Sequence, residues 1–125
     1  MTELPDPYVL YTNEDWKDVI ELITVEDEVE TFWEIPALTP LRMQIREKAC
    51  SIYIDLELST ANGRLLITET GRLAFNVPAG AIRSRLGPQD CEDRSFETDI
   101  LAWVQDRWVG VSRFDLVVKH GVTTA

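Results

Sequence analysis

The sequence predicts an all-β fold, an antiparallel β-sandwich or partly open barrel (Ig-like or jelly-roll-like), with one short helix near residues 79–86. Two observations predict this class. About seven or eight short runs alternate apolar and polar residues, which is the period of a strand with one buried face. Turn residues separate these runs at near-regular spacing, as in small sandwiches and barrels. Only the stretch 79–86 departs clearly from the period of two.

The segment 62–78 is the clearest β-hairpin in the chain. Apolar and polar residues alternate in its two runs, and Thr68-Glu69-Thr70-Gly71 separates the runs. Gly71 can take the positive φ that a tight reversal requires. The side chains expected on the buried face are those of Leu65, Ile67, Leu73, Phe75 and Val77.

Five further runs precede the hairpin and are predicted as strands: 8–11, 16–25, 31–35, 41–48 and 51–58. The run 16–25 also fits helical spacing, but its many β-branched residues favour a strand. The run 51–58 alternates most regularly, with Ile52, Ile54, Leu56 and Leu58 on the inner face. With the hairpin that follows, it predicts three strands in a meander.

The part of the chain after the hairpin begins with a helix. The segment 79–86 has room for one or two helical turns and ends at Gly87-Pro88. The runs 96–104 and 108–119 then predict two strands around a turn at 105–107, and Gly110 indicates a bulge or a close backbone approach. The second run places Val109, Val111 and Val117 on the face opposite Trp108, Phe114, Leu116 and Val118.

Length and charge limit the classes of function. A chain of 125 residues, 45% of them hydrophobic, fits one globular domain with loosely held ends at 1–7 and 120–125. Its net charge of −10 disfavours binding to nucleic acid or to an anionic membrane. The N-terminus shows no signal peptide and no run is long enough to span a membrane, so we expect a reducing cytoplasm and free thiols at Cys50 and Cys91.

A search for catalytic, cofactor or metal motifs leaves no candidate. His120 is the sole histidine, and no nucleophile-elbow pattern accompanies it. One histidine and two distant cysteines do not make a zinc site, and the acidic stretch 26–30 lacks the spacing of a calcium loop. Carboxylates that neighbouring strands could bring together, as glycosidases require, are Asp55, Glu57, Glu97 and Asp99. With 22 acidic residues, however, such a pairing is not diagnostic, so we predict a protein without enzymatic activity.

A binding surface is the functional feature that the sequence does suggest. The run 41–48 places Arg42, Gln44 and Arg46 in a row on one strand face, opposite its apolar residues. Three tryptophans on β-like runs could anchor a protein contact if they are exposed, although large aromatics more often belong to the core: Trp33, Trp103 and Trp108.

The order of short motifs along the chain carries one resemblance. In chain order they are Trp16, Leu38-Thr39, Met43-Gln44-Ile45-Arg46, Leu58-Ser59-Thr60, Gly63-Arg64-Leu65, Pro78-Ala79, Phe96-Glu97-Thr98-Asp99-Ile100, Gly110 and Gly121-Val122-Thr123. This order resembles a family of small tail-associated proteins encoded in bacteriophage and prophage structural modules. The acidic segment 96–100 stands where that family often has Tyr-Asp-Leu.

The resemblance implies a non-catalytic virion or tail-assembly protein, such as a tail-fibre or baseplate accessory domain. Its partners would be other phage structural proteins or further copies of itself. It would reside in the host bacterial cytoplasm during assembly and in the virion tail if incorporated. The alternatives are a bacterial regulatory β-domain and a carbohydrate-binding module, and an exposed coplanar tryptophan platform would favour the latter.

The hairpin assignment yields a stability prediction. Each apolar side chain on its buried face contributes about 1.5–3 kcal/mol through burial. Phe75→Ala is therefore expected to lower the free energy of unfolding by about 3–5 kcal/mol, enough to unfold a marginally stable domain. Thermal melting followed by circular dichroism measures this, and an unchanged melting temperature would contradict the face assignment.

Overall fold

The computed structural model describes residues 7–26, 29–32, 35–36, 38–69, 71–88 and 92–123, with only the backbone described for 23–26 and 29–32. The elements in chain order are β1 (Tyr8–Tyr11), β2 (Val19–Glu21), β3 (Ile23–Glu26), β4 (Val29–Phe32), β5 (Leu41–Arg46), β6 (Leu56–Ser59), β7 (Leu65–Glu69), β8 (Arg72–Phe75), α1 (Ala79–Leu86), β9 (Arg94–Val104) and β10 (Arg107–Lys119). The fold is mostly β with one short helix, as the sequence predicts.

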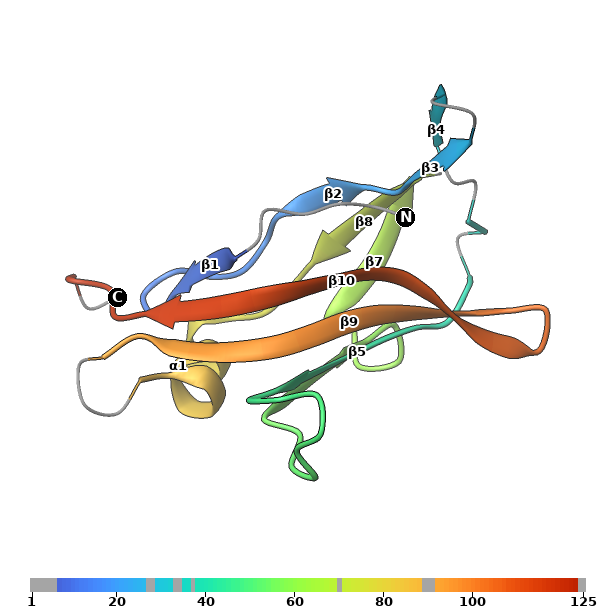
Figure 1. The fold of residues 1–125 in the computed structure, drawn as a ribbon. Coiled ribbons are helices and arrows are strands. Elements are labelled where there is room, and N and C mark those ends of the chain that lie inside the picture. Colours follow the sequence, from blue (N-terminus) through green and yellow to red (C-terminus); the bar gives the residue numbers. More distant parts are fainter. Residues whose placement is uncertain are drawn as a thin grey trace.

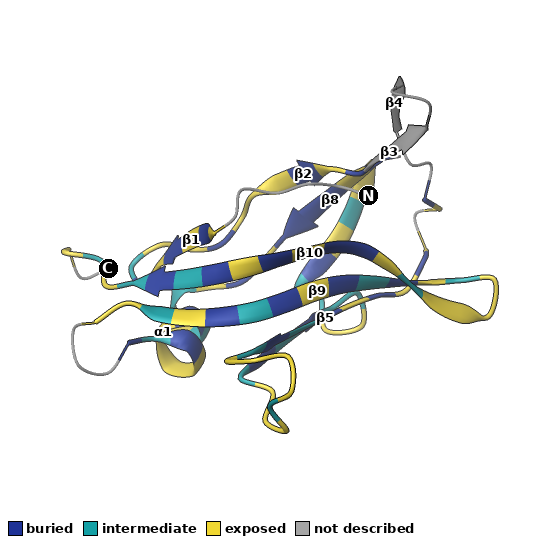
Figure 2. Ribbon diagram, in the orientation of Figure 1, coloured by how far each residue is buried: buried dark blue, intermediate teal, exposed yellow. Residues whose placement is uncertain are grey.

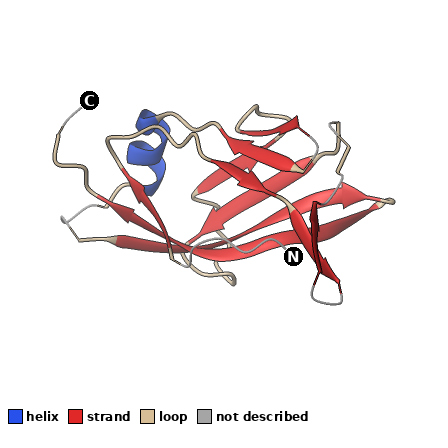
Figure 3. Cartoon of the chain, turned by 90° about the horizontal axis from the view of Figure 1, so that it is seen from above, coloured by secondary structure: helices blue, strands red, loops and turns tan. Residues whose placement is uncertain are grey.

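Two main sheets face each other (Figure 1). The larger one has the strand order β1-β10-β9-β5-β6 and curls into a half-barrel, and the smaller antiparallel one has the order β2-β8-β7. The strands β3 and β4 pair with each other as a separate hairpin. In Figure 3, seen from above, α1 lies at the end of the molecule where the C-terminus emerges.

The larger sheet is mixed rather than antiparallel, which corrects the sequence prediction. The strand β1 runs parallel to β10, with Tyr8 opposite Leu116 and Tyr11 opposite Lys119. A hairpin connection requires its two strands to be antiparallel, but β1 and β10 lie at opposite ends of the chain and no short turn joins them. The relative direction of β1 and β10 is therefore set by tertiary packing and not by a connecting turn.

The hydrophobic core lies between the two main sheets. Buried and exposed residues alternate along the long strands, as Figure 2 shows. Leu41, Met43 and Ile45 of β5 are buried, which confirms the predicted inner face of that strand. The helix adds Ile82 and Leu86, and its first turn is held by Asp15, whose Oδ1 accepts a hydrogen bond of 2.8 Å from the Ala79 N–H.

An aromatic cluster joins the two main sheets inside this core. The rings of Trp16 and Phe75 are stacked, with centroids 4.3 Å apart and planes inclined by 17°. Tyr8 lies against both rings and also against Phe114, at centroid distances between 5.7 and 6.4 Å. The Trp16 indole Nε1–H donates to the Tyr8 hydroxyl at 3.3 Å, so the buried polar atom of the indole is satisfied.

The predicted hairpin and helix are both confirmed. The strands β7 and β8 pair antiparallel around Gly71, whose φ is +78°. Leu65, Leu73, Phe75 and Val77 are buried, and Ile67 packs partly buried against the core. The helix spans the predicted residues and is followed by Gly87.

The segment 16–25 is extended, which confirms the strand prediction over the helical alternative. It contains an isolated bridge from Trp16 to Val77 and then β2 and β3. Trp16, Ile20 and Leu22 are buried, whereas Val19 is exposed. The alternation expected of a strand is thus present, and helical packing would have buried Val19 with Trp16 and Ile20.

The most regular alternation in the sequence is where the strand prediction is wrong. The strand there is Leu56–Ser59, so only residues 56–58 of the run 51–58 are in a strand, and the preceding residues belong to a loop, 47–55. Leu56 and Leu58 are buried as predicted, but Ile52 and Ile54 are exposed. The reason is the length of the partner strand. β5 ends at Arg46, and the last hydrogen bond between the two segments runs from the Asp55 N–H to the Ile45 carbonyl, so residues 51–54 have no strand to pair with.

The predicted three-strand meander is also wrong. The strand β6 belongs to the larger sheet, whereas β7 and β8 belong to the smaller one. The turn at 60–64 carries the chain from one sheet to the other, and Gly63 takes a φ of +77° within it. Because Leu58 and Leu65 both face the core from opposite sheets, the crossing buries both of them completely.

A bulge in β10 confirms the irregularity predicted at Gly110. Gly110 pairs with Leu101 and Ser112 pairs with Ile100, so Val111 is an extra residue. An extra residue reverses which side chains face inward. Phe114, Leu116 and Val118 are therefore buried while Trp108 is exposed, which corrects the prediction that they share one face.

The free edge of β6 is closed by one side chain. In an antiparallel strand the backbone groups of every second residue point away from the partner, and along β6 these are the groups of Glu57 and Ser59. The Asn62 Oδ1 accepts from the Ser59 N–H at 3.0 Å, and its Nδ2 donates to the Glu57 carbonyl at 3.0 Å. The side-chain amide thus takes the place that a neighbouring strand would occupy and protects an edge that could otherwise pair with another chain.

This contact predicts the effect of replacing Asn62. Asn62→Ala leaves the Ser59 N–H, the Arg64 N–H and the Glu57 carbonyl without their side-chain partner. Because these groups can reach water, we expect a loss of about 1–2 kcal/mol in the free energy of unfolding. Urea denaturation measures it. Asn62→Asp keeps the acceptor for both N–H groups and should lose less; equal stability of Asn62→Ala and the wild type would contradict the edge role.

Candidate functional site

The outer face of the larger sheet carries the predicted interaction residues that the structure describes. Arg42, Gln44 and Arg46 lie on β5, and Trp103 and Trp108 lie on β9 and β10. The two tryptophans sit beyond the N-terminal end of β5, since the Trp103 N–H donates to the Pro40 carbonyl at 2.9 Å. The sixth predicted residue, Trp33, lies outside the described residues.

The row on β5 forms a continuous hydrogen-bond network. The Arg42 Nε donates to the Glu57 Oε1 at 2.7 Å, and the Gln44 Nε2 donates to the same oxygen at 3.4 Å. The Gln44 Oε1 in turn accepts from the Arg46 guanidinium at 2.8 Å, and Arg46 also donates to the Ser51 carbonyl. The three side chains therefore fasten β6 and the loop 47–55 to β5, a structural task in addition to any binding.

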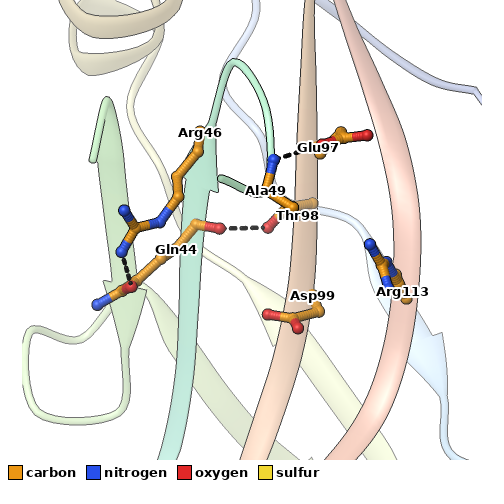
Figure 4. A pocket seen from close by; sticks show the side chains of 7 residues that line it. All are labelled: Gln44, Arg46, Ala49, Glu97, Thr98, Asp99 and Arg113. Atoms are coloured by element: carbon orange, nitrogen blue, oxygen red, sulfur yellow. Dashed lines mark hydrogen bonds between the residues drawn. The ribbon is translucent and has the colours of Figure 1, made fainter. Parts of the chain in front are cut away.

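A shallow depression of about 270 Å³ lies beside this network (Figure 4). Its lining residues are Gln44, Arg46, Ala49, Glu97, Thr98, Asp99 and Arg113. Two arginines and two carboxylates line it, and Glu97 accepts a hydrogen bond from the Ala49 N–H. Such a mixed and open lining suits polar contacts with a protein surface better than the enclosure of a small apolar ligand.

Trp103 and Trp108 form an exposed pair at the end of the β9–β10 hairpin. They are directly opposite in register, with ring centroids 5.2 Å apart and an interplanar angle of 70°. The two-residue turn of Gln105 and Asp106, with φ values of 51° and 59°, brings them together. Their exposed fractions are 40% and 41%, whereas Trp16 in the core is 2% exposed.

The bonding of Trp103 explains why the two rings touch. Its N–H points toward Pro40 and not toward β10, so Trp103 and Trp108 form a non-hydrogen-bonded pair, in which side chains lie closer. An edge-to-face aromatic pair contributes about 0.5–1.5 kcal/mol beyond its burial. The pair therefore stabilises the hairpin end and still presents a large aromatic surface.

The loop 47–55 displays apolar side chains that the sequence placed in the core or on a strand. Ile52 is 83% exposed and Tyr53 77% exposed, and the neighbouring Ile54 is also exposed. The alternating pattern gave no sign of this, because an extended loop and a strand read alike. The sequence offered no signal of it, because the predicted runs 41–48 and 51–58 are equally long, and only the structure shows that the paired strand ends at Arg46.

Of the four carboxylates considered for catalysis, Asp55 and Glu57 lie in ion pairs, and Glu97 and Asp99 line the depression beside arginine side chains. Asp55 pairs with Arg94 at 3.2 Å and Glu57 with Arg42, so these carboxylates face basic groups. His120 is exposed directly after β10. Cys50 is an exposed free thiol in the loop 47–55, and Cys91 lies outside the described residues. In the described part of the chain no group of three or more His, Cys, Asp or Glu side chains is placed to hold a metal ion.

The C-terminal segment is held at two points. The Gly121 N–H donates to the Thr12 Oγ1 at 3.1 Å, and the Asn13 Nδ2 donates to the Thr123 carbonyl at 2.8 Å. A Cβ at position 121 would collide with the Asn13 side chain, so glycine allows this close approach. Across the ranges that the structure covers, no helix has the length and apolar character to cross a membrane.

The network on β5 predicts a pH dependence. The hydrogen bond from Arg42, followed by that from Gln44, lowers the pKa of Glu57 below its ordinary value. A lowered pKa in the folded state stabilises the fold above the ordinary pKa, and this stabilisation is lost as the pH falls toward the lowered value. Arg42→Met should raise the pKa of Glu57 toward the ordinary glutamate value, as followed by NMR titration. Arg113→Met, on the same face, should not; an unchanged pKa in Arg42→Met would contradict the assignment.

Comparison with known proteins gives no match for this chain, whether with family models, with curated protein sequences or with solved structures.

Proposed function

We propose that the chain is a non-catalytic protein-binding domain that serves as a structural or assembly component of a phage or prophage tail. Its partners are other phage structural proteins or further copies of itself. It is present in the host bacterial cytoplasm during assembly, and in the virion tail if incorporated.

The exposed tryptophan pair is the observation that carries the binding role. Tryptophan is among the residues most enriched at the energetic centres of protein interfaces. Trp103 and Trp108 hold each other in place, so little side-chain freedom remains to be lost when a partner covers them. Arg42, on the same outer face, adds a guanidinium that Glu57 already orients.

The phage assignment rests on the order of motifs along the chain. It runs from Trp16 through the β5 strand and the β7–β8 hairpin to the segment 121–123. We also infer that the half-barrel and the smaller sheet together make the partly open barrel, in preference to an Ig-like or jelly-roll sandwich. The curl of the larger sheet supports the barrel.

The geometry of the tryptophan pair does not favour the carbohydrate-binding alternative. Sugar rings stack on flat aromatic faces, and a coplanar platform would offer two such faces side by side. The planes of Trp103 and Trp108 are instead inclined by 70°, with the edge of one ring against the face of the other. The mixed charges of the depression further along the same face fit a protein partner better than an uncharged sugar.

The test uses the phage or prophage that encodes the chain. We compare particle yield for the wild type, a deletion, Trp103→Ser/Trp108→Ser and the control Leu66→Ser, a similarly exposed apolar residue on the other sheet. The deletion and the double variant should each lower the yield of infectious particles at least about tenfold, whereas the control should not.

Two measurements complete this test. Circular dichroism establishes that the double variant is folded, and mass spectrometry of purified virions distinguishes a virion component from an assembly factor that leaves the particle. Normal yield from the deletion would overturn the phage role. Normal yield from the double variant alone would overturn the assignment of the tryptophan pair as the contact.

A further inference from the structure

The loop 47–55 adds no side chain to the hydrophobic core. The core contains Ile45, before the loop, and Leu56, after it, but no residue between them. The apolar side chains of the loop are exposed, and we define them as the loop tip: Ile52, Tyr53 and Ile54. A segment with few buried apolar contacts separates from its domain at a lower free energy than a strand of the core. The loop thus meets the first condition for a unit that opens without unfolding the domain.

Polar groups of the neighbouring strands hold the loop in place. The Ala49 N–H donates to the Glu97 carboxylate of β9, and the Arg46 guanidinium of β5 donates to the Ser51 carbonyl. When such hydrogen bonds break at the surface, water replaces the lost partner, so each contributes little net free energy. The closed position of the loop therefore depends on contacts that are easily exchanged for water.

Arg94, the first residue of β9, joins the two ends of the loop. Its Nη2 lies 2.6 Å from the Glu47 Oε1 and 3.2 Å from the Asp55 Oδ1. The side chains of Arg94 and Asp55 are only 26% and 21% exposed. Water and salt screen a partly buried ion pair less than a fully exposed one, so Arg94 is the strongest single attachment of the loop.

The Arg94 guanidinium is also fixed by groups outside the loop. Its Cζ lies 4.7 Å from the centroid of the buried Phe96 ring, and its Nη1 donates to the Arg85 carbonyl of α1 at 3.4 Å. The adjacent carboxylate, Asp93, pairs with Lys119 at 3.7 Å. Arg94 is therefore positioned to receive the loop without being ordered by it.

We propose that the loop 47–55 opens and closes as one unit beside the depression, with Arg94 as its latch. In the closed position Ala49 lines the depression, and its N–H engages the Glu97 carboxylate (Figure 4). Opening removes this wall, releases Glu97, and frees Arg46 from the Ser51 carbonyl. The latch thus controls the shape of the depression and the charged groups that it offers. The inference concerns the loop alone and holds for any partner of this face.

Native-state amide hydrogen exchange of the full chain, followed by NMR at increasing urea below the unfolding transition, tests the separate opening. The amides of Ala49, Ser51 and Asp55 report on the loop, and hydrogen-bonded amides of β5 and β9 report on the whole fold. Loop opening exposes little surface, so exchange in the loop should change little with urea, whereas exchange in the strands should rise steeply.

A core variant separates loop opening from global unfolding. Ile100→Val shortens a fully buried side chain of β9 and lowers the stability of the whole fold. It should accelerate exchange in the strands and leave exchange in the loop at the wild-type rate, because the closed and the open loop share the same core.

The latch is tested by Arg94→Met, which keeps an apolar side chain beside Phe96 and removes the charge. Exchange at the loop amides should accelerate about tenfold, because only the closed loop loses a contact. Arg72→Met, which breaks exposed ion pairs on the smaller sheet, should leave exchange in the loop unchanged. Should Arg94→Met prove unfolded by circular dichroism, Glu47→Gln/Asp55→Asn removes the same ion pairs and takes its place.

Glu97→Ala tests whether the loop moves as one unit. It removes the acceptor of the Ala49 N–H beside the depression and should accelerate exchange at Asp55, at the far end of the loop, as well as at Ala49. Three results would overturn the inference: loop amides that follow urea as the strand amides do, loop exchange in Arg94→Met equal to the wild type, or acceleration confined to Ala49 in Glu97→Ala. Particle yield plays no part in these measurements, so they are independent of the proposed function.

Discussion

The stacking of Trp16 on Phe75, with Tyr8 and Phe114 around them, holds the two main sheets together. Phe75 belongs to the smaller sheet, and Tyr8 and Phe114 belong to the larger one. Large aromatic side chains bury more apolar area than any others and fit one another in few geometries. This cluster therefore sets how the sheets face each other, and with it which face of β9 and β10 is left for solvent and for partners.

Because the inner face of the larger sheet is taken up by the core, its charged residues are confined to the outer face. On that face, the side chains of Arg42, Gln44 and Arg46 form hydrogen bonds that connect β5 to β6 and to the loop 47–55. Strands connected in this way change little on binding, which favours contacts with a rigid partner. The tryptophan pair and the loop tip are the apolar features that this face presents.

The candidate site was predictable in part. The row on β5 follows from alternation alone, because a strand with one buried face must expose its other residues. The exposure of Trp103 and Trp108 was not predictable, since tryptophan on a β run more often belongs to the core. For Trp108 the cause is the bulge at Val111. Because of this extra residue, Trp108 before it and Phe114 after it lie on opposite faces of β10. The loop tip was missed because its pattern is that of a strand.

The sequence by itself determined the β class, the hairpin around Gly71, the helix 79–86 and the inner face of β5, since each depends on local periodicity and turn chemistry. Only the tertiary structure decided that β1 runs parallel to β10, that β6 and β7 separate into two sheets, and that residues 51–55 of the strand-like run 51–58 form a loop. The physical reason is common to all three. Alternation states which side chains could be buried together, but a strand exists only where another backbone pairs with it, and that partner is chosen by contacts between residues far apart in the chain.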